Sequence, residues 1–424
     1  MSENREDIKT NFPQEPTHLV AFVGTYENSP NPGGGGIYVL GVSSDGCHLE
    51  LLSHVNDPKM AGYLVYAPSL STLYAVDERK TDGRGPVGPA ACIHAFAVDP
   101  RNGNLTWLNS KLAPGPFPTF LSIDETKRVI VSANHGSFDH IERVIQTADG
   151  DWTTGYVYDD STVVLYEVEA DGRLGKIRDV YILTGHGKDP NTSPQAGGHG
   201  QASAHAHCSV IDPSGQYVLV CDKATDQILV FRLGSKLEVA TTYKLPEETG
   251  PRHVAFDPAS GRAFVTFEFS SEIASFNFDD DIGELQLLDK QSTVARTYEG
   301  PNEPAEVRVH LNGKFVYVNN RGEDSLAWFR IGSGGELSRL GHVPLAKSIH
   351  PGLAARNFTF DPTGSFVLVA DRPANLIRSY AVNANDGGLT LLTDLLVPNP
   401  AFIAFAELYT KNVKSNDCEA TNLI

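Results

Sequence analysis

The stretch HCSVIDPSGQYVLVCD (207–222) decides the fold, because it contains two short apolar runs joined by a tight-turn sequence. In Asp-Pro-x-Gly, the aspartate binds nearby backbone amides, proline presets its own φ, and glycine accepts a positive φ. The flanking runs are rich in Val, Ile and Tyr, which favours β-strands. We therefore interpret this stretch as a strand, a turn and a returning strand.

The same hairpin pattern occurs five more times. The related stretches are LVYAPSLSTLYAVDE (64–78), FLSIDETKRVIVSAN (120–134), HVAFDPASGRAFVTFE (253–268), VRVHLNGKFVYVNN (307–320) and NFTFDPTGSFVLVAD (357–371). A third apolar run follows each hairpin, such as DQILVFRL (226–233), and a fourth often comes next, as in LTLLTDLLV (389–397). Each repeat is therefore about four antiparallel strands in about 50 residues, which is typical of a propeller blade.

The two ends of the chain supply a seventh unit. LVAFVGTY (19–26) and GIYVLGV (36–42) begin it, and AFIAFAEL (401–408) would pair into it. We predict an all-β fold, a seven-bladed β-propeller of four-stranded antiparallel blades, with the ring closed by pairing of the N- and C-terminal strands. The propeller should span 17–410, between flexible tails at 1–16 and 411–424. Insertions at 80–91, 136–160 and 185–206 fall at the same end of their hairpins, so they can crowd one face.

Composition narrows the class of partner. The 424 residues carry 34 Lys+Arg against 52 Asp+Glu, a formal net charge of −18, which argues against a nucleic-acid or anionic-membrane partner. The five cysteines are scattered and form no CxxC pair, and the first twenty residues lack an apolar signal region. We expect a cytoplasmic protein that is a monomer or a weak homo-oligomer. A small anionic ligand stays compatible, because a few arginines can reverse the sign of the potential inside one cleft.

Two positions of the repeat converge on one rim of the predicted ring, because the first strand leaves that rim and the second returns to it. Seven residues after the turn glycine, or its equivalent, lie Glu78, Asn134, Asp222, Glu268, Asn320 and Asp371. One residue further lie Arg79, His135, Lys223, Phe269, Arg321 and Arg372. The first strands are preceded by His207, Arg252 and Arg356, and the matching place before 307–320 is Ala305, three residues from Arg308. This pattern predicts a ligand site at the mouth of the central channel, although strand ends can also be polar simply as solvated caps.

The residue types indicate what such a site would do. Arginine binds carboxylate or phosphate with two parallel hydrogen bonds, so Arg252, Arg321 and Arg356 are candidate anion ligands. His207 is the first candidate for general acid or base, and Glu268 is a second base or an orienting carboxylate. Arginines beside Glu268 would lower its pKa and burial would raise it, and the sequence leaves the balance open. No metal is expected, because no cysteine or carboxylate spacing completes a ligand set around the histidines of 186–207.

At these residues the sequence resembles a known family. The signals are HAHCSVIDPSGQYVLVCD (205–222), GPRHVAFDP (250–258) with FVTFE (264–268), AEVRVHLNGKFVYVNNRGEDSLAWF (305–329), ARNFTFDPTGSFVLVAD (355–371) and the opening FVGTY (22–26). Together they are similar to the seven-bladed lactonase family, which includes propeller-type 6-phosphogluconolactonases and fungal 3-carboxy-cis,cis-muconate lactonizing enzymes. The match covers roughly 19–408.

The resemblance implies a cofactor-free active site with His207, Arg252, Glu268 and Arg321 at the catalytic positions. Around them we expect substrate contacts from Arg356, Arg308, Lys223, Asn134, His135, Glu78, Asn320 and Asp371. The insertions at 136–160 and 185–206 depart from the family pattern near the presumed pocket.

Three hypotheses follow. The first is an enzyme that hydrolyses a small anionic lactone, with a six-carbon phosphorylated sugar lactone as the leading substrate and water activated by His207 or Glu268. The second is a lactonizing cyclase, in which a carboxylate of an unsaturated diacid adds across its own double bond. A diacid needs two separate anion sites, whereas a sugar lactone needs one site and hydroxyl partners such as Asn134 and Asn320. The third is a non-catalytic propeller that binds a metabolite or a protein.

Overall fold

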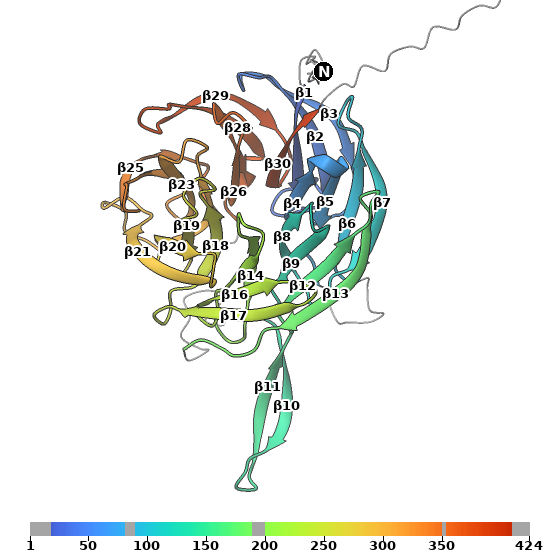
Figure 1. The fold of residues 1–424 in the computed structure, drawn as a ribbon, viewed down its shortest axis with the longest axis vertical. Helices are drawn as coiled ribbons and strands as arrows, with labels where there is room; N and C mark the ends of the chain where they lie inside the picture. The colour runs from blue at the N-terminus through green and yellow to red at the C-terminus, as the bar shows by residue number, and fades with distance from the viewer. Residues whose placement is uncertain (1–17, 81–89, 189–199, 350–352, 409–424) are drawn as a thin grey trace, which may run out of the picture.

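The computed structural model describes residues 18–80, 90–188, 200–349 and 353–408, and these form seven four-stranded sheets and one two-stranded sheet. The seven sheets stand as blades around a central axis (Figure 1). The fold is therefore the predicted all-β, seven-bladed propeller of antiparallel blades. The predicted tails, most of the insertion at 80–91 and half of that at 185–206 lie outside the described residues.

The ring closes as the sequence indicates. Blade 1 contains β30 (Pro400–Leu408), β1 (His18–Thr25), β2 (Gly36–Val42) and β3 (Leu49–Val55), from the inside outward. β1 pairs antiparallel with β30, so the last strand of the chain is the inner strand of the first blade.

The other blades follow the chain order from inside outward. Blade 2 contains β4 (Leu64–Ala67), β5 (Thr72–Val76), β6 (Cys92–Val98) and β7 (Leu105–Leu112). Blade 3 contains β8 (Pro118–Asp124), β9 (Val129–Asn134), β12 (Thr162–Val168) and β13 (Leu174–Ile182). Blade 4 contains β14 (Ala206–Ile211), β15 (Tyr217–Asp222), β16 (Gln227–Leu233) and β17 (Leu237–Lys244).

Blade 5 contains β18 (Pro251–Phe256), β19 (Ala263–Phe267), β20 (Glu272–Asp279) and β21 (Glu284–Ser292). Blade 6 contains β22 (Glu303–Val309), β23 (Phe315–Arg321), β24 (Ser325–Ile331) and β25 (Leu337–Pro344). Blade 7 contains β26 (Asn357–Phe360), β27 (Phe366–Asp371), β28 (Leu376–Val382) and β29 (Leu389–Leu396). Single 3₁₀ turns occur at Pro68–Leu70 and Arg372–Ala374.

Burial explains the strand sequences. The second strand of a blade is buried on both faces, because neighbouring blades stack on it, and β15 and β27 are buried at every residue. Such a strand reads as a continuous apolar run. Along an outer strand such as β17, more exposed and less exposed residues tend to alternate, because one face of the strand meets water.

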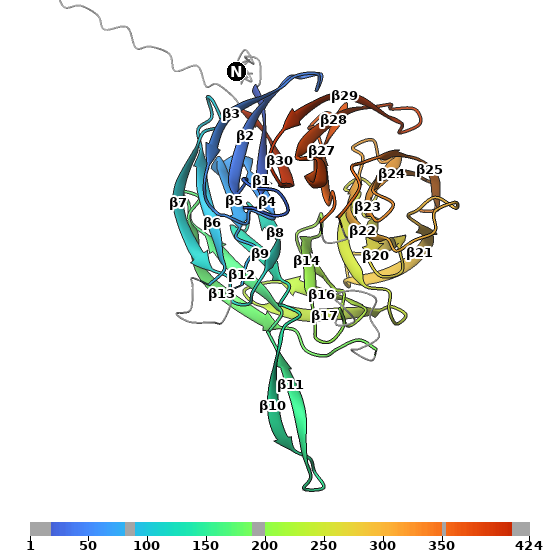
Figure 2. The same ribbon diagram turned by 180° about the vertical axis from the view of Figure 1, so that it is seen from behind.

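The insertion at 136–160 folds into a hairpin, β10 (His140–Gln146) paired with β11 (Trp152–Tyr158). This hairpin extends away from the ring (Figures 1 and 2). The expectation that the whole insertion crowds the face is therefore wrong, because its strands extend outward from a base where Lys80 contacts Asp139 and Asp159.

Aromatic rings fill the middle of the central channel. The ring of Tyr63, just before β4, lies 4.2 Å from that of Phe120 in β8 and 3.9 Å from that of Phe402 in β30, between centroids. The ring of His253 in β18 meets Phe120 edge-on at 5.3 Å. This plug separates the channel mouth at the start of the inner strands from the opposite mouth.

The closure of the ring predicts a stability effect. Ile403 of β30 is fully buried against β1 and blade 7, so Ile403→Ala should lower the free energy of unfolding by about 2–5 kcal/mol. Leu396→Ala is the matched control, because Leu396 is 74% exposed at the end of β29, and it should change stability by about 0.5 kcal/mol or less. Urea unfolding measures both, and similar losses in the two variants would contradict the closed ring.

Candidate active site

A residue at the end of the second strand of each blade, or one or two positions beyond it, points to one end of the ring. The turn-closing carbonyls of Tyr217, Arg262, Phe315 and Phe366 accept hydrogen bonds from the amides of Asp212, Asp257, His310 and Asp361. Six residues after these carbonyls lie Lys223, Glu268, Arg321 and Arg372. The remaining blades place Tyr26, Glu78 and His135 just beyond their second strands. These seven residues, one from each blade, form the rim ring.

Counting from the turn-closing carbonyl corrects the assignment of equivalent positions that was made by counting seven residues from the turn glycine. The glycine amide bonds back to an aspartate carbonyl in both turns, from Gly215 to Asp212 and from Gly261 to Asp257, so the second turn is one residue longer. Glu268 therefore occupies the same structural position as Lys223 and Arg321, and not that of Asp222. The glycine count had combined two positions of the blade.

A cavity of about 330 Å³ lies inside the rim ring. It brings together eight residues that the sequence predicts: His207, Arg252, Glu268, Arg321, Arg356, Lys223, His135 and Glu78. Phe117, Thr119, Gly136, Ser137, Phe138 and Asp139 complete its lining. First-strand starts and second-strand ends thus meet at one mouth of the channel.

Four other predicted residues lie outside this cavity. The side-chain amide of Asn134 donates to Pro114 O and Thr162 Oγ1, and that of Asn320 donates to Thr293 O and Ser325 Oγ. Asp371 accepts from Ala346 N and Arg378 Nε. These three occupy the position just before the rim ring, where they join strands within or between blades.

Arg308 lies on the far side of the aromatic plug. Its Nε donates to Phe358 O at 2.8 Å, and it lines a separate cavity at the opposite mouth with Glu306. The three-residue offset from Ala305 carries its side chain along β22 to the other end of the channel. We leave Arg308, Asn134, Asn320 and Asp371 out of the candidate site.

Glu268 is the centre of the site's charges. Its Oε2 lies 2.6 Å from Arg252 Nε and 3.2 Å from an Nη of Arg321, and its Oε1 lies 3.2 Å from Lys223 Nζ. All four side chains are buried, with exposed fractions between 2% and 6%. Arg321 also contacts Glu303 Oε2 at 3.1 Å. One carboxylate therefore holds three cations from three consecutive blades.

The cations decide the protonation of Glu268. Burial raises the pKa of its carboxyl group, but Lys223, Arg321 and Arg252 outweigh burial and hold the pKa well below its usual value. Burial, the repulsion from Arg321 and the attraction of Glu268 together leave the pKa of Arg252 at about 10, so it stays charged at neutral pH. Glu268 is consequently an ionised and weakly basic carboxylate.

His207 lies beside these charges as a neutral imidazole. Burial, followed by the positive charge of Arg252, lowers its pKa well below 6.5. The ring lies 5.1 Å from that of His253 and 5.5 Å from that of His135, between centroids. Its Nδ1 is buried without a hydrogen-bond partner among the described residues. A neutral imidazole is the form that accepts a proton in general-base catalysis.

A second charged group occupies the other side of the cavity. An Nη of Arg356 donates to both carboxylate oxygens of Glu78 at 3.2 Å, and Tyr26 donates its hydroxyl proton to Glu78. Glu78 raises the pKa of Arg356 despite burial. The guanidinium of Arg372 lies 4.3 Å from the Tyr26 ring centroid. Arg356 is thus already neutralised by a carboxylate.

Sequence reasoning missed the aromatic and hydroxyl lining. Phe138 comes from the start of the 136–160 insertion, and its ring centroid lies 5.5 Å from Lys223 Nζ. Thr119 stands at the start of β8, and its hydroxyl donates to His207 O at 3.2 Å. Alignment of Thr119 with the starts of the other first strands could have found it, whereas no repeat signal marks Phe138.

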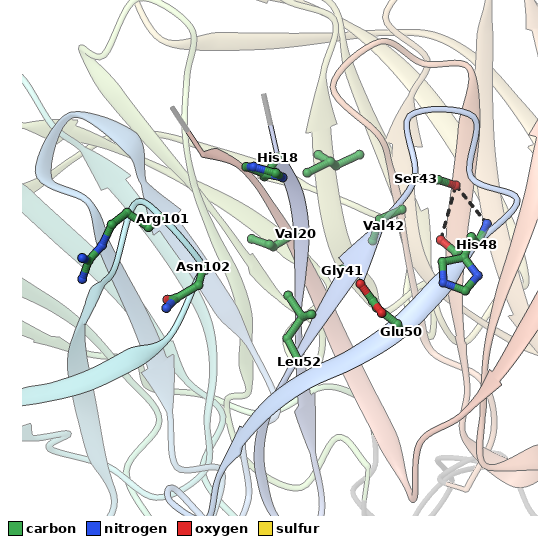
Figure 3. A pocket seen from close by; sticks show the side chains of 11 residues that line it. His18, Val20, Gly41, Val42, Ser43, His48, Glu50, Leu52, Arg101 and Asn102 are labelled. Atoms are coloured by element: carbon green, nitrogen blue, oxygen red, sulfur yellow. Dashed lines mark hydrogen bonds between the residues drawn. The ribbon is translucent and has the colours of Figure 1, made fainter. Parts of the chain in front are cut away.

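Other hollows of the surface lack this chemistry. A cavity of about 380 Å³ lies at the opposite end of β1 from Tyr26, where His18, His48, Glu50 and Arg101 surround it (Figure 3). All four of these side chains are exposed, and Figure 3 shows Ser43 and His48 hydrogen-bonded within their own turn. Within the described ranges, no cluster of three or more His, Cys, Asp or Glu has metal-binding geometry, and no helix is long and apolar enough to cross a membrane.

The family model and the named relatives that match this chain point to the same family. The model of the seven-bladed β-propeller lactonases matches residues 20–405. The 6-phosphogluconolactonase of Bacillus subtilis is 26% identical over 398 residues, which cover 92% of this chain and 99% of that protein. The 6-phosphogluconolactonase of Formosa agariphila is 26% identical over 387 residues, covering 89% of this chain and 96% of that protein.

Solved structures share the fold along the whole propeller. The periplasmic gluconolactonase PpgL of Pseudomonas aeruginosa superimposes with a TM-score of 0.76 at 24% identity, covering 93% of this chain and 100% of that one. A protein of Lactobacillus plantarum superimposes with a TM-score of 0.73 at 26% identity, covering 92% and 100%.

The charge cluster predicts that Glu268→Gln is strongly destabilising. The variant leaves three buried cations without their shared carboxylate, so the free energy of unfolding at pH 7 should fall by about 3–5 kcal/mol. Because the folded pKa of Glu268 is lowered, its contribution is complete above the unfolded glutamate pKa of about 4.3 and fades as the pH falls below it. Urea unfolding should therefore separate the two proteins most clearly near neutral pH.

Glu167→Gln is the control for this measurement. Glu167 pairs with Arg178 at 3.0 Å, but both side chains are about a third exposed, so the loss should be about 0–1 kcal/mol. An equally small loss in Glu268→Gln would contradict the proposed role of Glu268 as the shared counter-charge.

Proposed function

Because this chain belongs to the seven-bladed β-propeller lactonases, we propose that it hydrolyses a small anionic lactone in the cavity inside the rim ring. The leading substrate is a six-carbon phosphorylated sugar lactone. The names of the Bacillus and Formosa relatives, both 6-phosphogluconolactonases, support this substrate class.

The observation that carries the proposal is the surplus of positive charge around Glu268. Lys223, Arg252 and Arg321 outnumber Glu268 and Glu303, the two carboxylates that contact them, in a chain whose net charge is −18. Arg252 Nη1 is buried without a hydrogen-bond partner among the described residues. These cations would hold a phosphate or carboxylate of the substrate and stabilise the oxyanion that forms when water attacks the carbonyl.

We assign the general base to His207 and not to Glu268. Three cations make Glu268 a poor base, whereas His207 is neutral and lacks a partner at Nδ1. In the reaction, the water oxygen bonds to the lactone carbonyl carbon while His207 takes the water proton. The ring C–O bond then breaks, His207 returns that proton to the leaving oxygen, and the new carboxylic acid releases a proton to solvent. Glu268 holds the three cations in position throughout.

The charge distribution favours a lactone over a diacid. A lactonizing cyclase needs two separate anion sites, but Arg356 is bound on both oxygens of Glu78 and offers little free charge. One anion site then remains, beside Glu268. The hydroxyl partners expected from Asn134 and Asn320 are replaced by Thr119 and Ser137 of the cavity lining. Cytoplasmic location remains a prediction.

The proposal is tested by a pH-stat assay of freshly prepared 6-phosphogluconolactone. Wild type should release protons faster than spontaneous hydrolysis, and His207→Gln should lower kcat by about 10²- to 10⁴-fold because the general base is lost. Arg308→Met should keep wild-type turnover, since Arg308 lies beyond the aromatic plug. Spontaneous rates with wild type would rule out this substrate, and equal effects of the two variants would rule out the assigned face.

The pH dependence gives an independent test of the base. A base acts in its neutral form, and the pKa of His207 in the free protein lies well below 6.5. The acid limb of kcat/KM should therefore fall below pH 6.5, with activity retained between about pH 6.5 and 8. Initial rates at constant ionic strength measure this profile, and an acid limb centred above 6.5 would contradict the assignment.

A further inference from the structure

The hairpin β10–β11 is the least buried regular element that the structure describes. It leaves blade 3 between β9 and β12 and extends beyond the ring in both views (Figures 1 and 2). All seven residues of β10 and five of the seven of β11 are exposed. We call residues 140–158 the arm.

Large apolar side chains are concentrated on the arm. They are Ile141, Val144, Ile145, Trp152, Tyr156 and Val157, with exposed fractions from 45% to 78%. Each outer blade strand, by comparison, carries only one or two such residues among those described. Scattered apolar residues on a surface are ordinary, but six on two seven-residue strands indicate a contact surface.

Both faces of the arm are apolar. The strand register places Val144, Trp152 and Tyr156 on one face, and Ile141, Ile145 and Val157 on the other. A two-stranded hairpin with neither face covered is only marginally stable in water. The arm therefore fits an environment that covers it on two sides.

The base of the arm is held in a fixed direction. Lys80 Nζ lies 2.7 Å from Asp159 Oδ2 and 3.2 Å from Asp139 Oδ2, and the Ser137 hydroxyl donates to Asp159. These contacts clamp the two ends of the arm together beside blade 2. These contacts therefore fix the base of the arm while its strands extend outward.

The charge of the arm suits a second copy of this chain. Two copies repel one another, because each carries a net charge of −18. Within the arm strands, the charged residues are Glu142 and Arg143, which balance each other, and the turn between the strands adds Asp149 and Asp151 at the tip. The two faces of the arm are therefore neutral and apolar on a strongly acidic protein, with the net negative charge confined to the tip, and two copies can approach along these faces at low electrostatic cost.

The size of the arm also favours a second copy. Two seven-residue strands cover roughly 24 by 10 Å, so the two faces offer roughly 500 Å². In a reciprocal exchange, each subunit would bury its own arm and an equal area of the surface that binds the other arm, roughly 1,000 Å² in all. A stable interface needs about 800 Å² per partner. A single arm docked on an unrelated protein would bury about half as much.

We propose that the arm is a dimerisation element, through which two copies of this chain associate by reciprocal arm exchange about a two-fold axis. The proposal is independent of the lactonase reaction.

Sedimentation velocity and light scattering of the full chain, from about 1 to 100 μM, test the proposal. Wild type should show a mass about twice 45.9 kDa, rising with concentration. The variant Val144→Lys/Trp152→Lys places two charges on one face of the arm and should return the mass to about 45.9 kDa. Leu396→Lys is the matched control, because Leu396 is 74% exposed and Val144 is 78% exposed, and it should keep the wild-type mass.

Two results would overturn the proposal. One is a wild-type mass near 45.9 kDa over the whole concentration range. The other is a dimer that persists in Val144→Lys/Trp152→Lys with the wild-type concentration dependence. Far-UV circular dichroism of the variant excludes misfolding as the cause of a lower mass, since the substituted side chains are exposed and the blade strands should be unchanged.

Discussion

The arrangement of the cavity depends on a single buried carboxylate. Lys223, Arg252 and Arg321 come from three consecutive blades, and in a dry environment they would repel one another strongly. Glu268 lies within 3.2 Å of each of them and holds them around one point. The same contacts lower the pKa of Glu268 and, through Arg252, help to keep His207 neutral. The proposed anion binding and the proposed division of roles between His207 and Glu268 therefore have one electrostatic origin.

The propeller supplies the positions that this electrostatic cluster needs. Every blade begins its inner strand and ends its second strand at the same face, so each repeat can contribute two side chains to one channel mouth. The aromatic plug of Tyr63, Phe120 and Phe402 then limits the depth of the cavity. Ring closure by β30 fixes the spacing between blades 7 and 1, where Arg372 stacks on Tyr26. Activity is thus a property of the closed ring and not of a single blade.

The sequence predicted the fold almost completely, because a repeated hairpin reports both its strands and its spacing. It also brought together most of the cavity, since the repeat identifies strand ends. The errors have local causes. The turn of 257–261 is one residue longer than that of 212–215, so a count from glycine placed Glu268 with Asp222 and Asn320. Arg308 lies at the opposite mouth because it is three residues further along its strand than Ala305. The outward direction of the arm depends on the Lys80 contacts, which no sequence pattern reveals.

We propose that the cations around Glu268 select an anionic sugar ligand at this mouth of the channel. Isothermal titration of 6-phosphogluconate against sorbitol, the uncharged six-carbon sugar alcohol, tests it directly, in wild type, Arg252→Met and Arg308→Met. We expect the phosphorylated ligand to bind wild type and Arg308→Met alike, and Arg252→Met to weaken its binding by about 10- to 100-fold, the loss expected for a charge-assisted contact. Equal binding of the two ligands, or an Arg252→Met variant that binds 6-phosphogluconate as wild type does, would contradict the account.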